Sequence, residues 1–465
     1  MSLQRIVAWL LRVVLRVYFR RLERFHAERV PRSGPVIFAC NHPSSLMDAF
    51  VIGTSLPRPV FFVATVQLFR FKPLAWLLSH CGVIPVNRVR DDASAMRSVM
   101  ATFEACFRVL ERGEAIGIFP EGITHDDPQL KPIKTGTARM ALELEHRHGG
   151  KLGLQIVPVG LNFSAKEKYR SQVLIHFGEP LAVASFLNGY EARRRECIHA
   201  LHDELERRLQ ALIVHVPRLE HARVVQAVKR LYLERLRLGN IVIHEPLSPQ
   251  AEELVLTQAI TDAVEFGFAS FPERAEQFVR RLAVYEGWLE RLKLSDAAVE
   301  QLGQRGGIVW PSLARAALAV LGAPLAFYGG LHRLAPLAVV RWSVRRFTKA
   351  QKGLAQVSTT AILAGMVSFG FFYGIYALLF GQFFSLRATV VYALSLPLTG
   401  LLAHYYFRNL RRLAHGVWDT LVLLRLPIGR GRLRALRAEL IAEIERVREE
   451  YRQSLERRSP PAPGP

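Results

Sequence analysis

Short apolar runs alternate with helical stretches between residues 35 and 181. The runs at residues 36–39, 60–63, 115–119, 154–159 and 173–177 have the length and β-branched composition of strands. Residues 93–112 and 135–146 have the apolar spacing of helices. Strands that alternate with helices are typical of an α/β domain with a mainly parallel sheet, whose functional loops lie at the strand ends. We therefore expect a sheet domain flanked by helices at residues 28–185.

The segments on either side of this domain have helical patterns. In residues 1–27, arginines recur at helical spacing opposite Leu10, Val13 and Val17. This pattern predicts an amphipathic helix in the lipid headgroup region, with a helix packed on the protein's own core as the alternative. The arginines also interrupt the apolar stretch too early for a cleavable signal peptide. Residues 186–306 are charged and helix-periodic, which predicts a helical accessory region.

Two long uncharged segments predict a membrane-embedded helical hairpin. Residues 353–386 and 388–407 contain no charged side chain, and Arg387 separates them. Because a span needs roughly 20 apolar residues, we expect transmembrane helices near residues 357–379 and 388–407. Basic residues flank the pair on both sides, so the positive-inside rule places both flanks in the cytoplasm and the hairpin tip outside it.

The segment at residues 313–331 is apolar but shorter. Its uncharged part, residues 316–331, includes Pro324 and would reach about 24 Å as a helix, against a hydrocarbon core of about 30 Å. A re-entrant or interfacial segment is therefore favoured over a span, which remains the alternative. We expect a membrane region at residues 307–408. After it, residues 409–465 predict a basic helix and a disordered Pro-rich tail.

The charge balance favours a membrane surface as partner. The formal net charge is +22, yet 50% of the residues are hydrophobic. Strong positive charge suits either nucleic acid or anionic lipid, and the long apolar runs favour lipid. The sequence has no zinc-finger spacing or aromatic RNA-binding string, so we expect no nucleic-acid partner. Its four cysteines are scattered, which is typical of small buried side chains in a reducing compartment.

A histidine and an aspartate lie just after the first apolar run. His42 precedes Asp48, with five residues between them. A neutral imidazole can remove a proton from an alcohol near neutral pH. A carboxylate on its other ring nitrogen would fix the tautomer and stabilise the imidazolium. The alternative is a helix start in which Asn41, Ser44 or Ser45 is the cap and Asp48 lies on the helix surface.

Two further segments offer groups for an anion. Residues 119–122 are Phe-Pro-Glu-Gly, a turn that needs the backbone freedom of Gly122 and whose N–H groups could meet a phosphate. A purely structural turn is the alternative. Residues 82–88 form a strand-like run that ends in Arg88, and a guanidinium suits bidentate contact with phosphate. A surface ion pair with Asp91 or Asp92 is the alternative there.

Lys131 and Lys134 precede a predicted helix start and are further candidates for substrate binding; solvated surface lysines are the alternative. The run His-Asp-Asp at residues 125–127 lacks a second cluster of ligands, so we expect no metal site.

Four segments occur in the order and approximate spacing of the motifs of the phospholipid/glycerol acyltransferase family. They are Asn-His-Pro-Ser-Ser-Leu-Met-Asp at residues 41–48, the run at residues 82–88, Phe-Pro-Glu-Gly at residues 119–122, and Ile-Val-Pro-Val-Gly at residues 156–160. The chain resembles this family over roughly residues 31–181. The family usually has four residues between the histidine and the aspartate. The five found here resemble a branch that includes fungal-type glycerol-3-phosphate acyltransferases and bacterial relatives.

The resemblance implies a membrane-bound enzyme of phospholipid biosynthesis. Such an enzyme transfers a fatty acyl group from acyl-CoA or acyl-carrier protein to a hydroxyl of glycerol-3-phosphate or lysophosphatidate, without a cofactor. By resemblance, His42 is the general base, Asp48 is its orienting partner, and Arg88, Glu121 and Gly122 form the acceptor-phosphate site. Glu121 is anionic, so it would position Arg88 or bind the acceptor's hydroxyl rather than attract phosphate.

Two functions from other classes are the alternatives. The first is a catalytically inactive, membrane-anchored lipid-binding or scaffold protein with an acyltransferase-like domain. The second is a transporter, against which the few spans and their lack of acidic residues argue. We expect a multi-pass membrane protein whose catalytic domain lies on the cytoplasmic face. Its expected partners are membrane lipids, the acyl donor and a glycerophosphate acceptor.

Overall fold

The computed structural model describes residues 3–70, 72–86, 95–238, 247–301, 309–348, 356–425 and 427–458. The chain forms two compact units. One comprises Met1–Leu219, Leu247–Leu254 and Ser343–Leu363, and the other comprises Glu220–Pro246, Val255–Trp342 and Ala364–Pro465. We call them the sheet unit and the helical unit.

The sheet unit contains all the strands of the described chain. They are β1 (Arg21–Phe25), β2 (Val36–Cys40), β3 (Val60–Thr65), β4 (Ile84–Val86), β5 (Ala115–Ile118), β6 (Gln155–Phe163), β7 (Gln172–Phe177) and β8 (Leu181–Ala182). The order across the sheet is β1-β7-β6-β2-β5-β3-β4, with β8 paired to β6. All pairs are parallel except β6 with β7 and β6 with β8. The predicted fold, a mainly parallel sheet flanked by helices, is confirmed.

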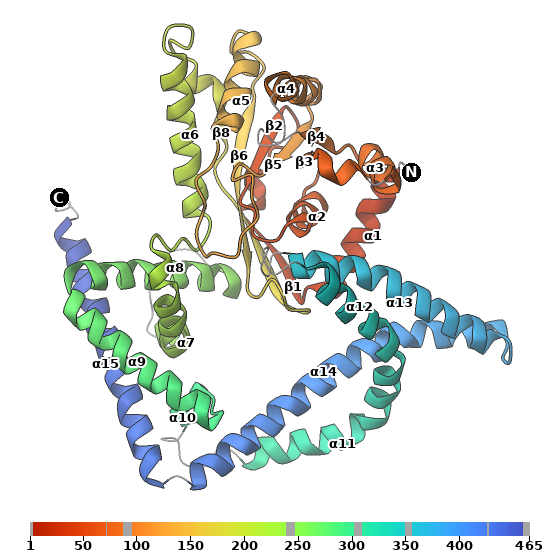
Figure 1. Ribbon diagram of the computed structural model, residues 1–465, viewed down its shortest axis with the longest axis vertical. Helices are drawn as coiled ribbons and strands as arrows, with labels where there is room; N and C mark the ends of the chain where they lie inside the picture. Colours follow the sequence, from red (N-terminus) through yellow and green to blue (C-terminus); the bar gives the residue numbers. More distant parts are fainter. Residues whose placement is uncertain are drawn as a thin grey trace. The chain divides into compact units, whose positions relative to one another are not determined.

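Helices lie on both faces of this sheet (Figure 1). They are α1 (Leu3–Tyr18), α2 (Leu46–Ser55), α3 (Lys72–His80), α4 (Ala95–Glu111), α5 (Gly136–Arg147) and α6 (Arg194–Ala211). Every residue of β2 is buried, as expected for a central strand covered on both faces. Ile37 and Ala39 of β2 belong to a core cluster with apolar residues of α4, α5 and α6. The sheet is therefore a rigid platform for the loops at its edge.

The register of the sheet brings two predicted motifs together. Val36 of β2 lies opposite Ala115 of β5, and Ala39 lies opposite Ile118. The two strands run parallel, so the chain leaves both of them at the same carboxyl edge of the sheet. The loop that contains His42 and the loop that begins at Phe119 therefore start side by side.

Two parts of the sheet unit differ from the expectation. The sequence pattern does not predict β1, because its polar composition is that of an exposed edge, yet it pairs in parallel with β7. Helix α6 lies in the region expected to be accessory, but its Leu201, Leu205 and Leu209 are buried in the core cluster. Helix α1 does expose apolar side chains, among them Trp9 at 58%.

The described residues that follow the sheet domain are mainly helical. They contain α7 (Ala222–Leu238), α8 (Pro249–Ser270), α9 (Pro272–Leu292), α10 (Asp296–Gln301), α11 (Val309–His332), α12 (Leu334–Phe347), α13 (Val357–Gly381), α14 (Leu386–Arg425) and α15 (Pro427–Arg458). The predicted helical region is thus confirmed. Helix α14 continues to Arg425, past residue 408, where we expect the membrane region to end.

Two helices are long and apolar enough to cross a membrane, as predicted: Val357–Gly381 and Leu386–Leu423. Their apolar side chains are largely uncovered; Val367 of α13 and Leu398 of α14 are 74% and 69% exposed. Apolar side chains exposed along two such helices suggest association with a membrane.

Helix α11 runs through Pro324 without a break and packs against α14. The backbones approach closely at Gly329, where a Cβ atom would lie 2.1 Å from the carbonyl oxygen of Thr399. The Tyr392 hydroxyl lies 2.9 Å from Nε2 of His332. The segment predicted to be re-entrant or interfacial is therefore packed along one of the two apolar helices.

Candidate active site

Asp48, in the first turn of α2, reaches back to the histidine before that helix. Nδ1 of His42 lies 2.9 Å from Oδ2 of Asp48, and the same oxygen accepts the N–H of Ser44 at 2.7 Å. Asp48 is completely buried, and Ser45 at the N-cap position makes no side-chain capping bond. The five-residue spacing therefore allows the contact, and the alternative in which Asp48 lies on a helix surface is wrong.

Asn41 fixes the chain immediately before the histidine. Its Oδ1 accepts the N–H of Leu161 at 2.7 Å, and its Nδ2 donates to the carbonyl oxygen of Leu161 at 3.2 Å. The side-chain amide thus continues the β2–β6 ladder by one step. This role differs from the helix cap that the sequence left open for Asn41.

The imidazole ring is also held on its face. It stacks on Phe119, with ring centroids 4.1 Å apart and planes inclined by 18°, and Phe119 stacks on Phe62 of β3. The His42 side chain is 19% exposed, and its Nε2 makes no hydrogen bond within the described part of the chain. One ring nitrogen is oriented by Asp48, and the other remains available for a proton.

The electrostatic environment favours a base over a thiol nucleophile. Burial raises the pKa of Asp48, while the hydrogen bonds from His42 and Ser44 and the charge of Lys166 act in the opposite direction. Burial raises the pKa of the Cys40 thiol, and Asp48 adds to that shift. Because only the thiolate is a strong nucleophile, Cys40 is inert.

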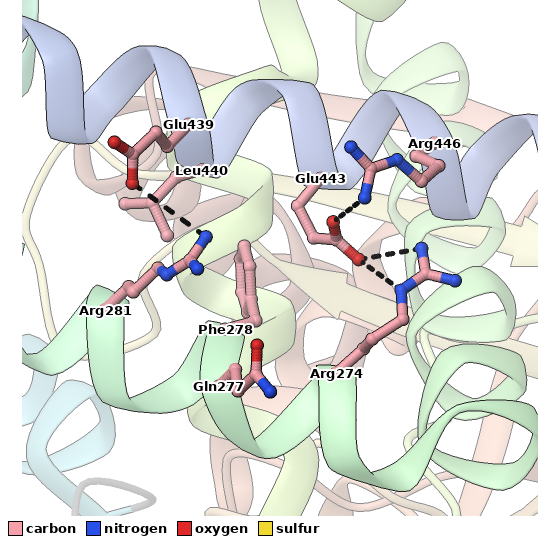
Figure 2. A pocket seen from close by; sticks show the side chains of 8 residues that line it. All are labelled: Arg274, Gln277, Phe278, Arg281, Glu439, Leu440, Glu443 and Arg446. Atoms are coloured by element: carbon pink, nitrogen blue, oxygen red, sulfur yellow. Dashed lines mark hydrogen bonds and ion pairs between the residues drawn. The ribbon is translucent and has the colours of Figure 1, made fainter.

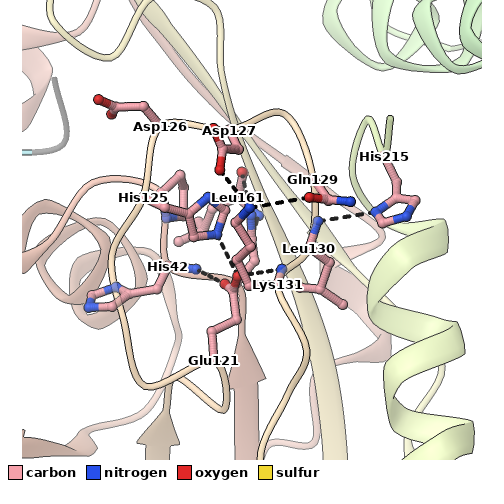
Figure 3. Close-up of polar contacts among 12 residues, drawn as sticks. His42, Glu121, His125, Asp126, Asp127, Gln129, Leu130, Lys131, Leu161 and His215 are labelled. Carbon is pink, nitrogen blue, oxygen red and sulfur yellow. Dashed lines mark hydrogen bonds and ion pairs between the residues drawn. The ribbon is translucent and has the colours of Figure 1, made fainter. Parts of the chain in front are cut away.

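Glu121 lies at the centre of the second motif (Figure 3). Its Oε1 accepts the backbone N–H of His42 at 2.7 Å, and its Oε2 accepts the backbone N–H of Lys131 at 2.9 Å. Nε2 of His125 lies 2.6 Å from the same Oε2. The carboxylate is only 2% exposed, so its oxygens are occupied by groups of its own protein. Figure 3 also shows that the ring of His42 points away from Glu121.

Gly122 and the two candidate lysines have different surroundings. Gly122 has a φ of 67°, and a Cβ there would lie 2.7 Å from Nζ of Lys134. Lys134 is exposed, and its ammonium group has no partner within the described residues. By contrast, Nζ of Lys131 lies 2.6 Å from Asp127, and its hydrogen bond lowers the pKa of that carboxyl. Lys134 is thus an uncompensated cation beside Gly122, whereas the charge of Lys131 is neutralised.

A lysine that the sequence analysis missed joins the two motif loops. Nζ of Lys166 donates to the carbonyl oxygens of Pro43 and His125, both at 3.0 Å. It also lies 2.8 Å from Oδ1 of Asp126. The only hint in the sequence is its position shortly after the Val-Pro-Val strand, which is now seen to be β6.

Two further predictions concern Arg88 and a metal ion. Arg88 lies outside the described residues, so its role stays a prediction. In the described ranges, no three or more His, Cys, Asp or Glu side chains are grouped to hold a metal ion.

A surface pocket lies elsewhere, between α9 and α15 (Figure 2). Its charged side chains are paired with one another: Arg274 lies 2.8 Å from Glu443, and Arg446 lies 2.9 Å from the same carboxylate. Arg281 lies 3.9 Å from Glu439. These ion pairs join two helices, and the pocket contains none of the predicted site residues.

Comparison with known proteins identifies the class of the sheet unit. The family described as Acyltransferase has a model that matches residues 21–162. The chain is 24% identical to an uncharacterized acyltransferase of Schizosaccharomyces pombe, over 48% of this chain and 46% of that protein.

More specific names occur among the other relatives. The chain is 29% identical to glycerol-3-phosphate O-acyltransferase 2 of Saccharomyces cerevisiae, over 43% of this chain and 26% of the relative. It is 29% identical to a 1-acyl-sn-glycerol-3-phosphate acyltransferase of Borreliella burgdorferi, over 40% and 70% of the two chains. The chain spans less than half the length of the yeast relatives. A solved lysophosphatidate acyltransferase from Thermotoga maritima is similar at 16% identity and a TM-score of 0.31, over 44% of this chain and 80% of that one.

The resemblance drawn from the four motifs is therefore confirmed. Residues 21–162 match the Acyltransferase family model, and relatives of this region are named glycerol-3-phosphate and 1-acyl-sn-glycerol-3-phosphate acyltransferases.

Proposed function

We propose that this protein is a membrane-bound O-acyltransferase. It moves a fatty acyl group from a thioester, acyl-CoA or acyl-carrier protein, to a hydroxyl of glycerol-3-phosphate or lysophosphatidate. The observation that supports this most is the contact of His42 with buried Asp48, which leaves the other ring nitrogen without a partner among the described residues. This is the arrangement that a general base for an alcohol requires.

The acceptor's phosphate is assigned to the side of the site near Gly122. An ammonium group attracts a phosphate, and that of Lys134, next to Gly122, has no partner among the residues that the structure describes. Both acceptors combine a phosphate with a free hydroxyl, which explains how one site could serve either. Arg88 would add a second cation to this side.

The reaction follows from these positions. The acceptor hydroxyl donates to Nε2 of His42, and its oxygen forms a bond with the thioester carbonyl carbon as Nε2 takes the proton. Asp48 stabilises the resulting imidazolium through Nδ1. The carbon–sulfur bond then breaks, and the leaving thiolate takes the proton from Nε2. No acyl-enzyme is needed, because the thioester is already activated and Cys40 is inert.

Three polar side chains keep the base in place without touching substrate. Glu121 accepts the backbone N–H of His42. Asn41, the residue before His42, accepts the N–H of Leu161, and Lys166 donates to the carbonyl oxygen of Pro43, the residue after it. We therefore assign Glu121 a positioning role in place of the membership of the acceptor-phosphate site that the resemblance implies.

The apolar helices keep the enzyme in the membrane that receives its product. We propose that α13 and α14 cross it and that the sheet unit faces the cytoplasm, since basic residues flank the pair.

The test is an acyl-transfer assay on membranes that contain the full chain. Labelled acyl-CoA or acyl-carrier protein is offered with glycerol-3-phosphate or lysophosphatidate. We expect transfer to at least one acceptor, and loss of about 10²–10⁴-fold in His42→Ala, the range for removing a general base. His148→Ala is the matched control, because His148 is an exposed histidine paired with Glu111. Full activity in His42→Ala would favour the inactive-scaffold alternative.

Orientation is tested separately by cysteine labelling. Ile123 is 47% exposed beside the site, and Gln382 follows α13. With Cys81→Ser as background, an impermeant maleimide should label Gln382→Cys in intact cells and Ile123→Cys only after lysis. The reverse pattern would overturn the cytoplasmic assignment.

A further inference from the structure

The first turn of the apolar helix α13 is built into the sheet unit. Ser358, Thr359 and Ile362 are 0%, 7% and 3% exposed. From Leu363 onward the same helix uncovers apolar side chains, and Val367 is 74% exposed. The polar start of this helix is therefore buried while its apolar body is not, which is unusual for a simple membrane anchor.

Thr359 contacts the turn between the catalytic histidine and aspartate. Its Oγ1 accepts the backbone N–H of Met47 at 3.2 Å and lies 3.4 Å from the carbonyl oxygen of Ser44, to which it can donate. Both contacts are buried. One hydroxyl group thus joins the residues on either side of Ser45 and Leu46.

The backbone of this turn makes two long hydrogen bonds of its own: Met47 N–H donates to the carbonyl oxygen of Ser44 at 3.2 Å, and Asp48 N–H donates to that of Ser45 at 3.1 Å. The first N–H groups of a helix lack the regular partners of its interior, and Ser45 at the N-cap of α2 adds no side-chain bond, so the hydroxyl group of Thr359 is a second acceptor for Met47 N–H. Ser45 also has a φ of 57° and a ψ of −135°, a conformation that a residue with a Cβ adopts only when its surroundings enforce it. The chain continues directly from this turn into Asp48, whose Oδ2 also holds the N–H of Ser44.

We propose that Thr359 is a positioning residue for the His42–Asp48 pair. Through its hydroxyl group, the start of the apolar helix fixes the turn that places Asp48 against the imidazole. This inference rests on the proposed function and adds a residue some 310 positions away in the chain, outside every motif. The substrates have no assigned contact with Thr359, so its loss should slow the chemical step without weakening binding.

The experiment compares isosteric and conservative variants in the full chain in membranes. Thr359→Val removes the hydroxyl group and keeps the shape, and we expect kcat to fall about tenfold, the effect of losing one or two buried hydrogen bonds, with KM within about twofold. Thr359→Ser restores the hydroxyl group and should recover most of kcat. Thr360→Val is the matched control, because Thr360 is the next residue and its hydroxyl group makes no hydrogen bond within the described residues.

Several results would overturn the proposal. They are an unchanged kcat in Thr359→Val, an equal loss in Thr360→Val, no recovery in Thr359→Ser, or a loss seen in KM alone. Activity is normalised to folded protein, and Thr359→Ala replaces the valine variant if the latter does not fold. If His42→Ala keeps full activity, the proposed function fails first. If His42→Ala is inactive while Thr359→Val is normal, only the present inference fails.

Discussion

In the sheet unit, the side chains withdrawn from solvent include carboxylates: Asp48, Glu121 and Glu145 are 0%, 2% and 0% exposed. In α13 and α14, the uncovered side chains are apolar; Leu378 and Leu394 are 74% and 62% exposed. The buried carboxylates all accept hydrogen bonds from their own chain; Glu145, for example, accepts the N–H groups of Gly153 and Leu154.

The two regions therefore suit different solvents. A buried charge is stable only where donors surround it, so the sheet unit uses its polar interior to fix loops. An exposed apolar helix is stable only where the solvent is itself apolar. Four sets of substitutions test this contrast, and they follow in order of decreasing expected effect.

The largest effect is expected from Asp48→Asn. The amide keeps the shape but offers His42 the wrong partner for its tautomer, and in comparable sites this lowers kcat about 10⁴-fold. The measurement is acyl transfer under saturating substrates. Asp203→Asn, on the exposed face of α6, should leave kcat unchanged. A loss below about tenfold in Asp48→Asn would mean that Asp48 does not orient the base.

The second prediction compares a Phe→Ala substitution in the sheet with one on the apolar helix α13. Phe38, in the central strand β2, is fully buried, so Phe38→Ala should lower the free energy of unfolding by about 3–5 kcal/mol. Phe371→Ala on α13 removes a ring that is 61% exposed and should cost far less. Thermal inactivation of detergent-solubilised protein compares them, and similar losses at both positions would contradict the contrast.

A charge on the apolar surface should act on membrane insertion. Val367→Lys places an ammonium group near the middle of α13, which costs about 3 kcal/mol at a helix centre. We expect less protein in the alkaline-resistant membrane fraction, whereas Val367→Leu should match the wild type. Unchanged membrane association of Val367→Lys would show that α13 does not enter the lipid.

The smallest expected effect is a difference in KM between variants of Lys134 and Lys131. Lys134→Ala removes the free ammonium beside Gly122 and should raise KM for the phosphorylated acceptor about tenfold, as for loss of one charge-assisted contact. The ammonium of Lys131 is already paired with Asp127, so Lys131→Ala should change KM less. Equal changes in the two variants would contradict the assignment of Lys134 to the phosphate.

Sequence reasoning reached the parts of the fold that depend on local pattern. The apolar runs at residues 36–39 and 60–63 became β2 and β3, because a buried parallel strand is nearly all apolar. The two apolar helices were predicted from the length of their uncharged apolar segments. Strand β1 was missed, since an edge strand is defined by its partner β7 and not by its own composition.

The candidate site likewise contains residues that the sequence could predict and residues that it could not. The His42–Asp48 contact was predicted because both residues lie in one short motif. Lys166 donates to the carbonyl oxygen of Pro43, and Thr359 accepts the N–H of Met47, and in each case the two residues are more than 100 positions apart. A single lysine or threonine has no pattern of its own in one sequence, so only the folded chain reveals such contacts.

The placement of Thr359 has a practical consequence for preparing this protein. A fragment ended before Val357 would remove the hydrophobic hairpin, but it would also remove the hydroxyl group that contacts Ser44 and Met47. Such a fragment could keep its sheet and still turn over slowly. Biochemists should therefore retain the beginning of α13 when they shorten the protein.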